Sequence, residues 1–166
     1  MIPVLDAGAL VCLLLGDPGA EEVASLLGGG SEAFAANIGE AVDELRRRGA
    51  DPHRAVVEVE RLLDEGVSAL AIDRTVALRG AALRAQHHAG HPAASLADCT
   101  AVAAAERVGG TVVTTSAAVD ALAWSIGVAA HRLGAAPLLV DQPVMAVMQV
   151  ASPPAREDSV SAVASP

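Results

Sequence analysis

Aromatic residues are almost absent from this chain of 166 residues. They make up 1% of the sequence, as Phe34 and Trp124, and there is no tyrosine. Proteins that hold single-stranded nucleic acid without sequence preference stack its bases on aromatic side chains, so a stacking surface of that kind is excluded. The net charge of −9 also argues against broad, non-specific nucleic-acid binding, although it is compatible with a local basic patch.

Long apolar runs and cysteines are scarce as well. The longest uncharged runs, residues 108–119 and 142–155, are shorter than the roughly 20 residues that a membrane-spanning helix needs. The apolar amino terminus lacks a basic leader and contains Asp6, so we do not expect a signal peptide. The two cysteines, Cys12 and Cys99, fall within expected helices. Without an export signal they predict buried free thiols and a cytoplasmic protein.

What the chain does have is a regular alternation of short apolar strands and helices. Strands are expected at residues 2–5, 33–36, 67–72, 111–115 and 128–133. Helices are expected at residues 6–15, 18–27, 37–48, 51–63, 73–89, 95–109 and 117–125. This alternation predicts an α/β fold with a mainly parallel central sheet that carries helices on both faces.

The length fits a single domain with a substantial core. We expect this domain to cover residues 1–136, since the character of the sequence changes beyond that point. Residues 137–150 form an apolar, methionine-containing extension, and residues 151–166 are rich in serine, proline and alanine. That last composition predicts a disordered tail.

Four polar residues stand at or near expected helix starts: Asp6, Glu40, Asp98 and Ser116. Three of them follow apolar stretches, and Asp98 precedes the apolar run CTAVAAAERV. Ligands of parallel α/β sheets bind at the carboxyl ends of the strands. Acids gathered there from distant parts of the chain supply the converging oxygen ligands that a hard divalent cation requires.

Helix capping offers a simpler explanation for each residue alone. Asp6 and Ser116 are good N-caps, and two pairs, Asn37 with Glu40 and Ser95 with Asp98, have the spacing of a capping box. Capping does not require an apolar strand before the acid, so the four positions together favour a site. The two roles are compatible, because the helix dipole stabilises the ionised carboxylate that a metal needs.

Four segments resemble, in order and spacing, the blocks of the PIN-domain family, and in particular the VapC-type toxin ribonucleases. They are VLDAGALVCLLLGDPGAEEVASLL, ANIGEAVDELRRRG, ASLADCTAVAAAERVG and TVVTTSAAVDALA, which together cover about residues 2–133. The resemblance implies a PIN-like three-layer α/β/α sandwich and a Mg²⁺- or Mn²⁺-dependent ribonuclease. Asp6, Glu40 and Asp98 would be its metal ligands, and Ser116 would position a water or a weaker second metal. It also implies a type II toxin–antitoxin system, with an RNA substrate, a small antitoxin and a homodimer as partners.

The chain departs from the family pattern at two positions. The family usually has a hydroxyl two residues after its first aspartate, where this chain has Gly8. It usually has an acid at the position of Ser116, within a Thr-x-Asp triplet that here reads Thr114-Thr115-Ser116. Asp120 follows one helical turn later and could substitute through water. Asn37 and Thr114 are further residues expected to support the nuclease site. A PIN-like RNA- or protein-binding module with weakened catalysis is the alternative.

Other candidates carry less information. Arg46, Arg47 and Arg48 form the best basic patch, either contacting RNA phosphates or stabilising a helix carboxyl end. Asp43 and Glu44 share the helix face of Glu40; a surface role is favoured for Glu44, and a supporting role in the site is left open for Asp43. His87, His88 and His91 are expected to lie at a solvated helix end. A phospho-acceptor signalling domain is disfavoured, because no lysine stands at the strand–loop positions that such a domain uses.

Overall fold

A five-stranded sheet, parallel throughout, forms the centre of the molecule. The computed structural model describes residues 2–28 and 33–134, so the extension and tail expected at 137–150 and 151–166 lie outside the described residues. The strand order is β3-β2-β1-β4-β5. The strands are β1 (Pro3–Leu5), β2 (Ala33–Ala35), β3 (Val67–Ala69), β4 (Thr111–Thr114) and β5 (Ala129–Arg132).

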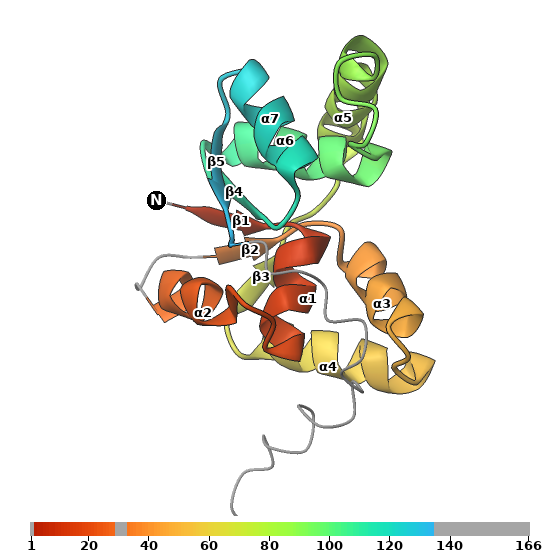
Figure 1. Cartoon of the computed structure of the whole chain (residues 1–166), viewed down its shortest axis with the longest axis vertical. Helices are drawn as coiled ribbons and strands as arrows, with labels where there is room; N and C mark the ends of the chain where they lie inside the picture. The colour runs from red at the N-terminus through yellow and green to blue at the C-terminus, as the bar shows by residue number, and fades with distance from the viewer. Residues whose placement is uncertain (1, 29–32, 135–166) are drawn as a thin grey trace, which may run out of the picture.

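Helices cover both faces of this sheet, as the sequence predicts. Figure 1 shows α1 to α4 below the strands and α5 to α7 above them. The lower helices are α1 (Ala7–Leu15), α2 (Ala20–Gly28), α3 (Ile38–Arg47) and α4 (Pro52–Asp64). The upper helices are α5 (Arg74–His87), α6 (Leu96–Val108) and α7 (Ala117–Ser125). The three-layer α/β/α sandwich is thereby confirmed.

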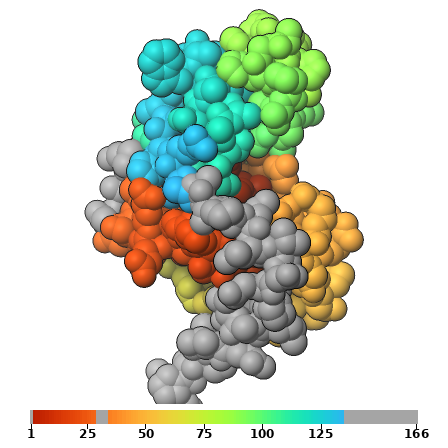
Figure 2. Space-filling model, viewed as in Figure 1, coloured from red at the N-terminus to blue at the C-terminus, as the bar shows by residue number. Residues whose placement is uncertain are grey.

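The sheet separates two hydrophobic cores. Val4 packs with the helices α5 to α7, whereas the next residue, Leu5, packs with α1 to α4. Neighbouring side chains of a strand point to opposite faces, so a strand covered on both sides reads as a continuous apolar run. Figure 2 shows the same division at the surface, with the green-to-blue upper part above the orange-to-yellow lower part.

The central strands match their expected bounds closely, and the edge strand is shorter than expected. All residues of β1 and β4 are buried, whereas β3 at the sheet edge exposes Ser68 and Ala69. The sequence predicts a strand over residues 67–72, but β3 ends at Ala69 because it has a hydrogen-bonded neighbour on one side only, β2. Apolar residues beyond that pairing lie in the loop before α5, where Ile72 is exposed.

Most helices begin at polar caps close to the expected positions. The carboxylates of Asp6, Asp51 and Asp73 and the hydroxyls of Ser95 and Ser116 each accept a backbone hydrogen bond at the start of a helix. Pro18 lies in the turn before α2, not in its first turn as expected. The described helices include none that is both long and apolar enough to cross a membrane. Cys12 and Cys99 are buried free thiols, as predicted.

Candidate active site

The sheet topology brings three chain segments to one edge. Leu5, the last residue of β1, lies in register with Ala35 on one side and Val113 on the other. The strands therefore end together, and the residues after β1, β2 and β4 meet at the carboxyl edge. The chain passes to β2 and β3 on one side of β1 and returns to β4 on the other side. The crevice beside β1 at this switch point is where open α/β sheets bind ligands.

Asp6 is buried at this edge, with an exposed fraction of 3%. Its Oδ1 accepts a hydrogen bond of 2.8 Å from the Ala9 amide, which makes it the N-cap of α1. Burial raises the pKa of Asp6 from 3.8 to about 6, while hydrogen bonds from Thr114 and Ala9 oppose that rise. The charges of Asp98 and Glu40 raise the pKa of Asp6 further, so both carboxylates lie within electrostatic reach of it.

Glu40 lies in the first turn of α3 and faces the same crevice. Its Oε2 is the one buried side-chain nitrogen or oxygen atom without a hydrogen-bond partner among the described residues. Burial raises the pKa of Glu40, Asp98 raises it further, and Arg47 opposes the shift. A buried carboxylate oxygen without a partner is costly, because desolvation is not compensated by any hydrogen bond.

Asp98 enters from the other side of the sheet, in the first turn of α6. The expected capping box with Ser95 is present: the Ser95 amide donates to Asp98 Oδ2 at 2.7 Å, and the Asp98 amide donates to Ser95 Oγ at 3.0 Å. One carboxylate oxygen of Asp98 is thus held by the cap. The fold brings Asp6, Glu40 and Asp98 together from three different helices.

The other expected capping box is not formed. Asn37 is the N-cap residue of α3, but its side chain accepts no capping hydrogen bond. Its backbone is left-handed, with φ 60°, and its side-chain amide instead donates to the carbonyl of Ala97. Asn37 therefore ties the start of α3 to the start of α6, and the Glu40 carboxylate is left free of the cap.

Thr114 links the fourth predicted position to Asp6. It is fully buried, and its Oγ1 accepts a hydrogen bond of 2.9 Å from the Ser116 amide while its hydroxyl bonds to Asp6. Ser116 caps α7 by accepting from the Val119 amide at 3.4 Å. Asp120 lies in the first turn of α7 but is not among the main causes of the raised pKa values of Asp6 and Glu40.

The donors in this crevice fit a hard cation that keeps part of its water shell. Within residues 2–28 and 33–134, no three His, Cys, Asp or Glu side chains are close enough to hold a metal ion by themselves. Mg²⁺ commonly binds through one or two carboxylates, with waters and substrate phosphate as the other ligands. The unpartnered Glu40 Oε2 and the mutually repelling carboxylates suit such an ion. Which of them are ligands stays a prediction.

The expected basic patch is paired with acids, mostly those of α3, and Arg48 also pairs with Asp17 at 2.8 Å. Arg46 and Arg47 both bond to Asp43, and Arg48 bonds to Glu44 at 3.0 Å. The sequence favours a surface position for Glu44, but the side chain of Asp43 is 52% exposed and that of Glu44 only 26%. RNA contact by the three arginines stays a prediction.

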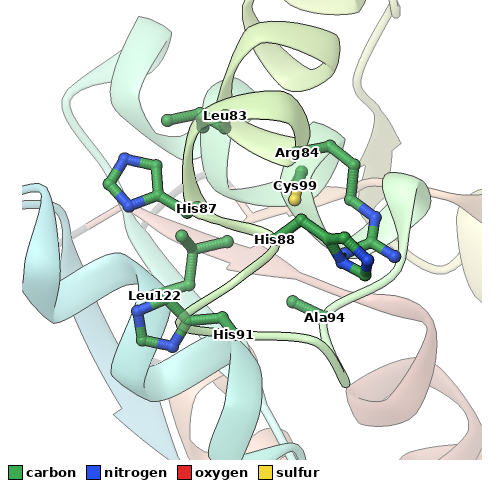
Figure 3. Close-up of a pocket in the computed structure, with 8 residues that line it drawn as sticks. All are labelled: Leu83, Arg84, His87, His88, His91, Ala94, Cys99 and Leu122. Carbon is green, nitrogen blue, oxygen red and sulfur yellow. The ribbon is translucent and has the colours of Figure 1, made fainter.

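His87 is the last residue of α5, and His88 and His91 follow it in the loop before α6. Figure 3 shows the rings of His87 and His91 beside Leu122, with the Cys99 thiol to their right. The His87 and His91 ring centroids are 6.3 Å apart, and Arg84 contacts His88. This geometry matches the expected helix end, and the described residues provide no third ligand for a metal here.

Residues 4–124 match the family model of the PIN domain, so the chain belongs to the PIN-domain family. Among curated proteins, none matches the sequence significantly. The fold is similar to VapBC-1 from nontypeable Haemophilus influenzae, with a TM-score of 0.59, 17% identity, and coverage of 80% of this chain and 98% of the other. It is similar to VapBC2 from Rickettsia felis, solved bound to a DNA fragment from its promoter, with a TM-score of 0.63, 12% identity, and 81% and 100% coverage. FitAcB from Neisseria gonorrhoeae gives a TM-score of 0.53, 22% identity, and 79% and 97% coverage.

Two site features could not be read from the sequence. The tether from Asn37 to Ala97 joins residues far apart in the chain, and the capping pattern pointed to a different partner for Asn37. The second feature is Thr115, which the triplet pattern leaves as an unspecified position. Its only trace in the sequence is the missing side chain at Gly8, with which it is in close contact.

Proposed function

We propose that the chain is a metal-dependent endoribonuclease and the toxin component of a type II toxin–antitoxin pair. The observation that supports this proposal most directly is the buried, unpartnered Glu40 Oε2 beside two further carboxylates. Such an arrangement is unfavourable for an empty protein and favourable for one that binds a cation. Membership of the PIN-domain family and the resemblance to VapC-type toxins supply the substrate class, RNA.

Asp6, Glu40 and Asp98 are the residues that would hold Mg²⁺ or Mn²⁺, one or two of them directly and the others through water, since the three are not close enough to bind one ion together. When bound, the ion would lower the pKa of a water molecule and stabilise charge that develops on the scissile phosphate. Thr114 keeps Asp6 in its ionised form, because its hydrogen bond lowers the pKa of that carboxyl. Ser95 fixes the orientation of Asp98 through the capping box.

Substrate recognition would depend on the RNA backbone and its shape. The near absence of aromatic side chains leaves little surface for stacking bases. The three carboxylates repel phosphate unless a cation lies between them. The ion would therefore be needed both for chemistry and for approach of the substrate.

Replacement of each acid by its amide tests the proposal. The variants D6N, E40Q and D98N remove charge with little change in shape, and asparagine still caps a helix. We expect RNA cleavage in Mn²⁺ or Mg²⁺ to fall about 100-fold or more in each variant, with native circular dichroism retained. Asp51→Asn is the matched control, since Asp51 also caps a helix but lies at the start of α4. Cleavage by all three amide variants at the parent rate, or cleavage that persists in EDTA, would show that the acidic site is not catalytic.

A binding module with weakened catalysis is the second candidate. It is favoured by the neutral Ser116 at the fourth acidic position and by Gly8 near Asp6. A parent protein that binds RNA or a protein partner, but cleaves no RNA at saturating Mn²⁺, would support this candidate against the enzyme.

A further inference from the structure

Thr115 places a hydroxyl group at the mouth of the acidic crevice. It forms the bend between β4 and α7 and is half-buried. A Cβ atom added at Gly8 would lie 2.5 Å from Thr115 Oγ1 and 3.7 Å from Thr115 Cβ. The hydroxyl oxygen, and not the body of the side chain, is therefore the part of Thr115 that approaches position 8.

The same position lies beside the buried carboxylate. The Cβ added at Gly8 would be 3.3 Å from Asp6 Oδ1. The Thr115 hydroxyl and the Asp6 carboxylate thus border one small space at the start of α1. A side chain at position 8 would force the Thr115 hydroxyl to move, because a non-bonded contact of 2.5 Å to a Cβ atom is too short.

We propose that Thr115 is a positioning residue of the acidic site, whose hydroxyl takes the place of a side-chain hydroxyl at position 8. This inference depends on the proposed function. Gly8 is one of the two departures from the family pattern, and it is the residue that admits Thr115. The Thr115 hydroxyl reaches the space beside Gly8 from the loop after β4, whereas a side chain at position 8 would reach it from α1.

The chemistry of the crevice explains what such a group does there. Carboxylates accept hydrogen bonds and cannot donate them when ionised, whereas a threonine hydroxyl does both. With a hydrated cation bound, the Thr115 hydroxyl would accept a hydrogen bond from a metal-bound water or donate one to a phosphate oxygen of the substrate. It orients these groups relative to Asp6 without adding charge.

The simpler explanation is that Thr115 only fills space in the bend. Thr115→Val separates the two roles, since valine keeps the branched shape and removes the hydroxyl. Thr115→Ser does the opposite, because it keeps the hydroxyl and removes the methyl group. Thr111→Val is the matched control: Thr111 is at the other end of β4 and is also buried.

The measurements are Mn²⁺ affinity by calorimetry and the melting temperature without metal, on the full-length chain. We expect T115V to bind Mn²⁺ about fivefold more weakly than the parent, which corresponds to one lost hydrogen bond, with its melting temperature unchanged. T115S and T111V should bind like the parent. The exchange variant G8S/T115A, which moves the hydroxyl to position 8, should recover most of the affinity.

A second readout tests the steric part without any metal. An alanine in place of glycine normally stabilises a helix, yet G8A should lower the melting temperature because its Cβ meets Thr115 Oγ1. G8A/T115A should restore it. T115V that binds Mn²⁺ as tightly as the parent overturns the inference and leaves the proposed function standing. A parent that binds no Mn²⁺ overturns both.

Discussion

The buried position of Asp6 opposes its proposed role. A metal ligand must be ionised, but burial and the neighbouring acids favour the protonated form of Asp6. The hydrogen bonds from Thr114 and Ala9 reduce this conflict without removing it, since the pKa of Asp6 stays at about 6. The site is therefore formed at a cost in stability that a bound cation would relieve.

This cost predicts an unusual pH dependence of stability. Because the folded chain holds the Asp6 proton more tightly than the unfolded chain, the free energy of unfolding falls as the pH rises from 3.8 to about 6. A shift of this size corresponds to about 3 kcal/mol. Without metal, Asp6→Asn should therefore be more stable than the parent by up to about 3 kcal/mol at pH 8, and by little at pH 4.

Urea unfolding in EDTA at several pH values measures this difference. Asp51→Asn, which removes the charge of an exposed cap, should show no stabilisation that grows with pH. Added Mn²⁺ should stabilise the parent and not D6N. A constant stability difference between parent and D6N across the pH range would contradict the raised pKa of Asp6.

Replacement of Ser116 by aspartate should increase the affinity for metal. Ser116→Asp restores the missing acid and preserves the helix cap, since aspartate caps as well as serine. Mn²⁺ affinity should rise about tenfold, and RNA cleavage should increase with it. Ala117→Asp is the control, because it adds the same charge at an exposed position one residue later. Calorimetric titration that shows equal or weaker binding by S116D would refute this prediction.

At the scale of whole elements, the start of α3 is fixed to the start of α6 by one side chain. Asn37 is the only residue other than glycine with positive φ among residues 2–28 and 33–134, and asparagine tolerates that conformation well. Asn37 donates a hydrogen bond to the carbonyl of Ala97, the residue directly before Asp98. Glu40 lies three residues after Asn37. The tether therefore sets the separation of two predicted ligands that belong to opposite layers.

Two substitutions separate the tether from the backbone conformation. Asn37→Gly accepts the positive φ but loses the hydrogen bond, so Mn²⁺ affinity should fall about fivefold with a small loss of stability. Asn37→Ala loses both and should be less stable than N37G by about 1 kcal/mol. Chemical denaturation and calorimetry of both variants provide the data. Parent-like Mn²⁺ binding by N37G would show that the tether does not position the site.

The contrast between the two capping boxes shows what the sequence could predict. Ser95 and Asp98 interact within one helical turn, so their spacing was sufficient to predict the contact. Asn37 and Glu40 have the same spacing, but a carbonyl from another layer competes for the Asn37 side chain. The positions of the helices and of the three acids followed from local patterns, whereas the Asn37 tether and the contact of Thr115 with position 8 depend on tertiary packing.

At the scale of the whole molecule, the repulsion among the acids predicts a way to inhibit the proposed ribonuclease. An arginine from a partner protein would pair with the carboxylates in place of the cation, since its planar group matches carboxylate geometry. Apolar residues available to such a partner include Leu26 and Leu27 on α2, which are half-buried, and the exposed Val56 and Val57 on α4. These residues could equally pack against a second copy of the chain.

Co-expression with the small reading frame beside the gene tests this prediction. We expect a stable complex whose RNA cleavage is suppressed at least tenfold relative to the protein alone. Replacing one arginine at a time by alanine in the partner should identify the inhibitory side chain without dissolving the complex. Equal RNA cleavage with and without the partner protein would refute inhibition by that partner. A dimer formed by the protein alone would assign the apolar surface to self-association.

The position of the acids on both sides of the sheet also has a consequence for synthesis on the ribosome. Asp6 and Glu40 are made early and lie in the lower layer, but Asp98 belongs to α6 in the upper layer. At about 5–20 residues per second, the stretch from Asp6 to Asp98 takes on the order of ten seconds to translate. β4, which carries Thr114 and pairs with β1, is made later still. A chain that ends before β4 therefore lacks part of the site, and the proposed ribonuclease would stay inactive on the ribosome until that segment has been made.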